Sequence, residues 1–193
     1  MDNAGHARLK GQTPCVVWLT GISGAGKSTV ACEVQGRLRA LGKHTLLLDG
    51  DDMRRGLNHD LGFTDADRME STRRVAEVAK LAAAAGLIVI VALISPFRSA
   101  RGMARSLVPA GRFFEVHVDT PIEIAEARDP KLLYRKARRG EITDFTGIDS
   151  PYEAPERPEL RLDGTHPSPD ALADQVIELL HGAGFLRDAD GVL

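Results

Sequence analysis

The sequence has few of the features that mark secreted, membrane-spanning or nucleic-acid-binding proteins. It contains two cysteines, Cys15 and Cys32, which lie in an expected strand and helix, so we expect two buried thiols and no disulfide framework. No apolar run is long enough to span a bilayer, and the first fourteen residues have no hydrophobic stretch typical of a secretion signal. The net charge is −2, from 25 basic and 27 acidic residues, which provides no global field to attract nucleic acid or membranes. We therefore expect a cytoplasmic protein with neither of these partners.

The chain does have enough apolar sequence for one sizeable core. Apolar residues make up 43% of its 193 residues, an ordinary share for a globular domain. It contains no internal repeats and no low-complexity tracts. We expect residues 1–13 to form a flexible tail and residues 14–193 to form a single domain.

One glycine-rich stretch organises the rest of the sequence. Residues 21–28 read GISGAGKS and fit the phosphate-binding pattern G-x-x-x-x-G-K-[ST]. The apolar run 15–20 before it predicts a buried strand, and apolar residues at helical spacing follow it to residue 41. In this context, backbone N–H groups and a helix N-terminus attract phosphate. Lys27 supplies charge to the β- and γ-phosphates, and the Ser28 hydroxyl suits Mg²⁺.

Two other glycine motifs do not fit this stretch. A dinucleotide-binding fingerprint needs a third glycine where Thr29 stands. The nucleophile elbow of the hydrolases needs glycine in place of Ala25. The pattern therefore predicts a site for a nucleoside triphosphate.

The remaining chain alternates strands with helices. Apolar runs predict further strands at 44–48, 87–93, 113–118 and 160–162, and helices are expected at about 64–85, 98–107, from 121, 131–139 and 170–180. This alternation predicts an α/β fold, a three-layer sandwich of the P-loop NTPase type with a central parallel sheet of five strands. Ligands of such sheets bind beyond the carboxyl ends of the strands, so we expect one cleft there.

Two carboxylates follow the second expected strand. Asp49 and Asp51 can hold Mg²⁺ or its waters, or accept a proton from an attacking hydroxyl. The alternative is a structural role, in which Asp51 or Asp52 caps a short helix.

Cations and aromatic residues in other segments are further candidates for ligand binding. Guanidinium groups such as those of Arg54 and Arg68 bind phosphate and sulfate in a bidentate way. The basic helix 131–139 is either a lid over a polyphosphate or a plain exposed helix. Phe63 and Phe145 lie in polar loops, where an aromatic ring either stacks on a base or makes a core contact.

Seven motifs carry a resemblance beyond the phosphate loop, and they cover nearly the whole chain from about residue 14 to residue 180. In order they are GISGAGKS at 21–28, LDGD at 48–51 with Arg54, Gly56, Leu57 and Asn58, LGF at 61–63 with Asp67 and Arg68, EVAKL at 77–81, ISPFR at 94–98, DPK at 129–131 with Leu133 and Tyr134, and FTGIDSPYEAP at 145–155. With these motifs the chain resembles the adenylylsulfate kinase (APS kinase) family.

The resemblance implies ATP- and Mg²⁺-dependent phosphorylation of the 3′-hydroxyl of adenosine 5′-phosphosulfate (APS), a step of sulfate activation. It implies ATP-binding residues Gly21, Ile22, Ser23, Gly24, Ala25, Gly26, Lys27, Ser28, Thr29 and Arg138. It implies APS-binding residues Asp49, Arg54, Phe63, Arg68, Ser71, Ile94, Ser95, Lys131 and Phe145. Ser28 and Asp51 are the expected metal ligands, and Lys27, Asp51 and Ser95 are the expected catalytic residues.

The resemblance also raises questions that the sequence leaves open. Ser95 stands where the family is traditionally given a phosphoserine intermediate, but phosphate-loop kinases need only positioning and charge neutralisation, so we expect direct in-line transfer. Asp52 and Ser71 each stand where an asparagine is usual, and Leu93 replaces a common aromatic residue. The resemblance implies a homodimer and a functional association with ATP sulfurylase. The alternatives are a kinase for another small acceptor and a non-catalytic nucleotide-binding domain.

Overall fold

One five-stranded parallel sheet forms the centre of the fold in the computed structural model, which describes residues 3–165 and 168–186. The strands are β1 (Val16–Thr20), β2 (Thr45–Asp49), β3 (Ile88–Ala92), β4 (Phe113–Asp119) and β5 (Leu160–Asp163). They run in the order β2-β3-β1-β4-β5, and each pair of neighbours is parallel. The predicted sheet is therefore confirmed.

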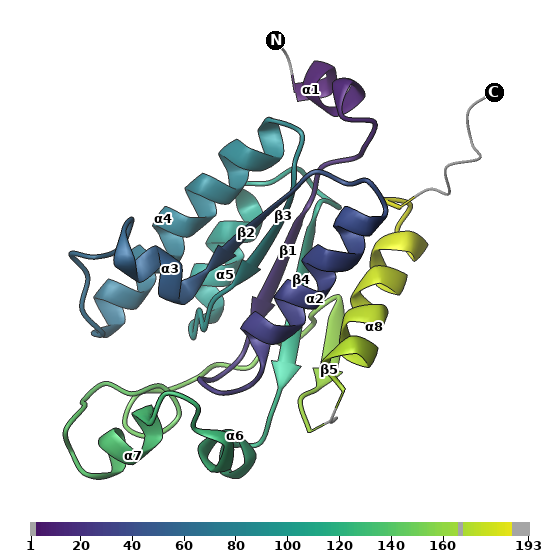
Figure 1. Cartoon of the computed structure of the whole chain (residues 1–193). Coiled ribbons are helices and arrows are strands. Elements are labelled where there is room, and N and C mark those ends of the chain that lie inside the picture. The colour runs from purple at the N-terminus through teal and green to yellow at the C-terminus, as the bar shows by residue number, and fades with distance from the viewer. Residues whose placement is uncertain (1–2, 166–167, 187–193) are drawn as a thin grey trace.

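Helices cover both faces of the sheet, as Figure 1 shows. Helices α2 (Lys27–Ala40) and α8 (Pro169–Gly182) pack on one face, and α4 (Asp65–Ala84) and α5 (Arg98–Ser106) on the other. Because successive strand residues point to opposite faces, Val17 and Leu19 join the first apolar core while Trp18 joins the second. This arrangement confirms the expected three-layer sandwich.

Three shorter helices lie beyond the carboxyl ends of the strands. Helix α3 (Gly50–Arg55) directly follows β2, and α6 (Ile122–Arg128) and α7 (Leu133–Arg138) follow β4. A small third apolar cluster joins α6 and α7 to the loop after them, through Ala125, Tyr134, Ala137 and Phe145. These segments form a wall over one end of the sheet, where the site is expected.

The N-terminal segment differs from the expected loose tail. Residues Asn3–Leu9 form helix α1, and Gln12 fixes the chain after it. The Gln12 side-chain amide donates to the carbonyl oxygens of His44 and Gly86 at 2.8 Å, and its own oxygen accepts from the His44 N–H at 2.8 Å. The predicted end of the domain at residue 193 lies outside the described residues.

Two further local expectations are wrong. The basic helix begins at Leu133 instead of residue 131, because the Asp129 carboxylate accepts from the N–H groups of Tyr134 and Arg135 and so sets the start of the helix. Cys32 is exposed, whereas Cys15 is buried, and both thiols are free.

Among the described helices, none has the length and apolar character needed to cross a membrane.

Candidate active site

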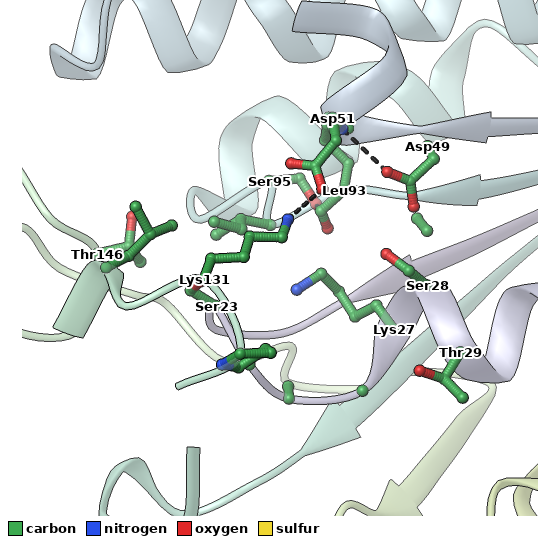
Figure 2. A pocket seen from close by; sticks show the side chains of 18 of the residues that line it. Ser23, Lys27, Ser28, Thr29, Asp49, Asp51, Leu93, Ser95, Lys131 and Thr146 are labelled. Atoms are coloured by element: carbon green, nitrogen blue, oxygen red, sulfur yellow. Dashed lines mark hydrogen bonds and ion pairs between the residues drawn. The ribbon is translucent and has the colours of Figure 1, made fainter. Parts of the chain in front are cut away.

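A cavity of about 970 Å³ lies beyond the carboxyl ends of the strands. The phosphate loop forms one wall, α3 and the end of β3 form another, and the 128–134 and 142–146 segments face them. Figure 2 shows side chains from these segments turned toward one common space. The cleft expected beyond the carboxyl ends of the strands is therefore present.

The phosphate loop depends on its glycines for its shape. Gly24 and Gly26 have φ of +73° and +102°, the left-handed region in which side chains are strained. A Cβ atom on Gly21 would stand 2.6 Å from the Val118 carbonyl oxygen, so the loop packs directly against the backbone at the end of β4. The loop leads straight into α2, whose first residue is Lys27, and this places a helix N-terminus at the cavity.

Lys27 is buried in this loop and aimed into the cavity. Its Nζ donates to the Ile22 carbonyl oxygen at 2.8 Å. Burial lowers the pKa of Lys27 from its ordinary value to about 8, and the nearby Asp49 carboxylate partly opposes that change. A desolvated ammonium of this kind gains from an anionic partner, and a phosphate group would supply one.

The two carboxylates at the end of β2 have different environments. Asp49 Oδ1 accepts from the Asp51 N–H at 2.9 Å and caps α3, so neither Asp51 nor Asp52 is the capping residue. Asp49 Oδ2 is buried and has no hydrogen-bond partner within the described residues. The Ser28 and Asp49 side chains line the same cavity, as Figure 2 shows.

These oxygen atoms fit a magnesium ion. Mg²⁺ prefers carboxylate, hydroxyl and water oxygens, and the buried Asp49 Oδ2 is a possible metal-ligating oxygen without a partner among the described residues. The Asp51 carboxylate is exposed to the cavity and forms an ion pair with Lys131. The Asp51 carboxylate therefore has a positive charge next to it within the cavity.

The opposite part of the cavity combines cations with aromatic rings. The Arg54 guanidinium lies 4.1 Å from the centroid of the Phe63 ring, and Arg68 donates to the carbonyl oxygens of Phe63 at 2.9 Å and Asp144 at 2.5 Å. Burial lowers the pKa of Arg68, and the neighbouring Arg54 lowers it further. Two partly desolvated guanidinium groups so close together favour an anionic ligand.

The two phenylalanines do not have the same environment. Phe63 is 50% exposed, whereas Phe145 is 7% exposed and packs edge-on against Tyr134 with ring centroids 4.9 Å apart. Both line the cavity. Phe145 thus makes the core contact that the sequence left as an alternative, and it still presents part of its surface to a ligand.

Ser71 and its neighbour Asn58 form a polar pair at the cavity. The Asn58 side-chain amide donates to Ser71 Oγ at 2.9 Å, while Asn58 Oδ1 is buried and unpartnered within the described residues. Thr146 is a second such case, since it lines the cavity with a buried hydroxyl that has no partner there. No sequence pattern assigned a role to Asn58 or Thr146, although both belong to the family motifs.

Ser95 has structural partners for its hydroxyl. Its backbone has φ of +40°, and its side chain is 2% exposed. Ser95 Oγ accepts from Trp18 Nε1 at 3.0 Å and donates to the Leu93 carbonyl oxygen at 3.3 Å. Next to it, the Ile94 carbonyl oxygen accepts from the Thr20 hydroxyl at 2.7 Å.

Most of the predicted site residues line the cavity, and three do not. The lining includes Ser23, Gly24, Ala25, Gly26, Lys27, Ser28, Thr29, Asp49, Asp51, Arg54, Phe63, Arg68, Ser71, Ile94, Ser95, Lys131 and Phe145. Gly21 and Ile22 are not part of it, because they pack against the protein below the loop. Arg138 is also outside, because Glu126 holds its guanidinium through two hydrogen bonds at 2.8 and 3.0 Å. Arg128 lines the cavity instead, and no sequence pattern pointed to it.

Comparisons with known proteins agree with this geometry. The adenylylsulphate kinase family matches residues 13–163. The chain is 57% identical to the adenylyl-sulfate kinase of Marinobacter nauticus, with 97% of this chain and 94% of that protein covered. It is 51% identical to the Mycobacterium tuberculosis APS kinase CysC, solved in complex with AMPPNP and APS, with a TM-score of 0.84 and coverage of 88% and 99% of the two chains.

Some relatives are much longer. The bifunctional enzyme NodQ of Azospirillum brasilense is 61% identical over 93% of this chain, but this match spans only 29% of the relative's length. The match over most of the chain to shorter relatives defines the family of this domain. By sequence and by fold, the chain belongs to the adenylylsulphate kinase family.

Proposed function

We propose that this chain transfers the γ-phosphate of ATP to the 3′-hydroxyl of APS, giving ADP and 3′-phosphoadenylyl sulfate. The observation that carries the proposal is the composition of the cavity beyond the carboxyl ends of the strands. One side offers a phosphate loop with a buried lysine, and the other offers two guanidinium groups beside two phenylalanine rings. A donor triphosphate and an acceptor with a base and an anionic group match these two halves.

The donor half acts by holding and neutralising phosphate. Residues 23–28 line the cavity at the N-terminus of α2, where backbone N–H groups attract phosphate, and Lys27 adds a positive charge. Ser28 and Asp51 stay the predicted ligands of Mg²⁺, and Asp49, whose Oδ2 is buried without a partner among the described residues, would be a further one. When bound, this ion neutralises charge on the β- and γ-phosphates.

The acceptor half acts by orientation. Arg54 and Arg68 bind the phosphosulfate, and Phe63 and Phe145 stack on the adenine. Ile94, Ser95 and Ser71 then border the ribose. Holding the 3′-hydroxyl in line with the γ-phosphate supplies most of what phosphoryl transfer requires.

Asp51 accepts the proton of the attacking 3′-hydroxyl. Its carboxylate faces the cavity and pairs with Lys131, so the lysine also lies where negative charge gathers during transfer. Ser95 contributes by position, because its hydroxyl is buried and engaged by Trp18 and the Leu93 carbonyl. These contacts support direct transfer without a phosphoserine.

The longer relatives support one further element of the proposal. NodQ and CysN/CysC are named as bifunctional enzymes, which supports a functional association between this kinase and ATP sulfurylase, the enzyme that makes APS. The expected homodimer stays a prediction, and sedimentation at micromolar concentration would measure it.

The function is tested by a coupled assay of ADP release with the full chain, ATP and Mg²⁺. Turnover is measured with APS and with a panel of nucleosides and sugar acids. We expect turnover with APS at micromolar concentration and at most trace turnover with the others. Faster turnover with a nucleoside or a sugar acid would contradict the proposed acceptor, and no nucleotide turnover at all would contradict the enzyme.

A further inference from the structure

A buried arginine outside the cavity connects two parts of its wall. Arg101, on α5, is 2% exposed and does not line the cavity. Its Nη1 donates to the Ser95 carbonyl oxygen and its Nη2 to the Glu153 carbonyl oxygen, each at 2.6 Å, and its Nε donates to Glu115 Oε1 at 2.6 Å. Each of the three guanidinium nitrogens therefore donates to a different segment of the chain.

Both carbonyl partners belong to segments that lead into the acceptor half of the cavity. Ser95 follows Ile94 at the end of β3, and both line the cavity. Glu153 ends the loop that begins with Phe145 and Thr146, and these two residues line the cavity from the other side. Between them the loop is folded tightly, with the Ser150 N–H bonded to the Phe145 carbonyl at 3.2 Å and the Gly147 N–H to the Ser150 carbonyl at 2.8 Å.

Other contacts depend on the same junction. The Glu153 N–H donates to the Pro96 carbonyl oxygen at 2.9 Å, and the Glu153 carboxylate accepts from the Arg98 N–H at 2.7 Å at the start of α5. The Tyr152 hydroxyl lies 3.0 Å from the hydroxyl of Thr20. Arg101 sits at the centre of this network, because it alone among these side chains contacts both Ser95 and Glu153.

The chemistry of the contact is specific to a guanidinium. Glu115 is 12% exposed in its side chain and balances the buried charge. A planar guanidinium offers N–H groups in several fixed directions, whereas a lysine ammonium is a point charge at the end of a flexible stem. A lysine at this position keeps the charge and cannot reproduce all three contacts.

We propose that Arg101 is a positioning residue for the acceptor half of the site, fixing the Ile94–Ser95 turn relative to the Phe145 loop. It acts through these segments and touches neither substrate. The inference rests on the proposed function for its substrate, APS. The donor half is formed by the phosphate loop, which Arg101 does not contact, so its removal affects the two substrates unequally.

The test compares Arg101→Lys with a matched control, Arg105→Lys. Arg105 lies one turn later on the same helix and also binds Glu115, at 3.3 Å, and it holds Glu159 at 2.7 Å, but it contacts no segment of the cavity wall. We expect R101K to raise the KM for APS about tenfold or more, since a displacement of about 1 Å in an active site can lower catalytic efficiency by up to about a hundredfold. We expect the KM for ATP to stay within about twofold of wild type, and R105K to leave both values near wild type.

The single tryptophan provides a second readout that needs no substrate. Trp18 is the only tryptophan in the sequence, it is fully buried, and its Nε1 donates to Ser95 Oγ at 3.0 Å. A shift of the Ser95 turn therefore changes the surroundings of its indole. We expect R101K to shift the fluorescence emission of the folded, ligand-free protein to longer wavelength than that of wild type. Arg105 lies 4.9 Å over the ring of Phe113, which stacks on Trp18, so R105K serves as the control for the KM values and wild type as the control for the emission.

A folding defect is separated from a positioning defect by the pattern of the results. A merely structural role lowers the fraction of active enzyme, so kcat falls while both KM values and the emission of the folded fraction stay the same. If R101K does not fold, the double variant Arg101→Gln with Glu115→Gln repeats the measurements, because it leaves neither buried charge unpaired.

The positioning role is overturned if the two lysine variants raise the KM for APS equally, or if R101K changes neither that KM nor the Trp18 emission. The proposed function fails in a different way, through the absence of APS turnover in the wild-type enzyme. In that case the emission of R101K still decides whether Arg101 positions Ser95.

Discussion

Replacing Ser95 by alanine separates its structural role from a covalent one. In the structure the Ser95 hydroxyl is the acceptor for the buried Trp18 Nε1 at 3.0 Å. Alanine removes that acceptor and leaves the indole N–H without a partner in the core. The same substitution removes any nucleophile that a phosphoserine intermediate would need.

The expected loss of stability follows from the lost contact. Leaving a buried donor unsatisfied costs about 1–3 kcal/mol. For a chain of this length, each kcal/mol lowers Tm by about 2–4 °C, so we expect S95A to unfold about 2–12 °C below wild type. The expected effect on turnover is a partial loss, because direct transfer needs the position of the Ser95 backbone more than its hydroxyl.

Calorimetry measures the stability, and Trp18→Phe supplies the matched partner variant. The double variant should lose less stability than the sum of the losses in S95A and W18F, because each single substitution already breaks the same hydrogen bond. Incubation with γ-³²P-ATP should leave no stable label on the wild-type protein. An unchanged Tm for S95A would refute the structural argument. An inactive S95A together with label on wild-type Ser95 would refute direct transfer.

Three other predictions address the two halves of the site and the core. Lys27→Ala should lower kcat about a hundred- to a thousandfold. Tm should change little, because the loss of the hydrogen bond from Lys27 Nζ to the Ile22 carbonyl is offset by the removal of a buried charge. Near-normal turnover would argue against the phosphate loop. Arg68→Ala should raise the KM for APS about tenfold or more, as expected for a lost charge-assisted hydrogen bond, and affect that for ATP far less; equal effects would remove Arg68 from the acceptor half. Iodoacetamide at pH 8 should modify the exposed Cys32 and spare Cys15, whose pKa burial raises to about 12, and two adducts in the intact mass of the folded protein would contradict that packing.

The parts of the fold that could be predicted are those encoded in local patterns. Apolar runs of five or so residues between helical segments predicted the parallel sheet, and the glycine spacing at 21–28 predicted a loop whose φ values suit glycine. Most of the residues that the family resemblance assigned to the site line the cavity. These features depend on residues close together in the chain.

The parts that were missed depend on contacts between distant residues. Nothing near Gln12 indicates that it bonds to Gly86, 74 residues later, and this contact holds a segment that looks like a loose tail. In the sequence Arg101 resembles any other cation of an exposed helix, and its contacts with Glu115 and Glu153 become visible only in the folded structure. Cys32 occupies a helical position that lies toward the surface, and the helical period alone did not show which face is buried.

Transfer of phosphate to the 3′-hydroxyl of APS is tested with APS analogues that each lack one hydroxyl. ADP release is measured with APS, 2′-deoxy-APS and 3′-deoxy-APS at equal concentration, with product identified by ³¹P NMR. We expect turnover with APS and with the 2′-deoxy analogue, a new phosphomonoester signal from each, and no turnover with 3′-deoxy-APS. ADP release that persists with 3′-deoxy-APS would contradict this transfer.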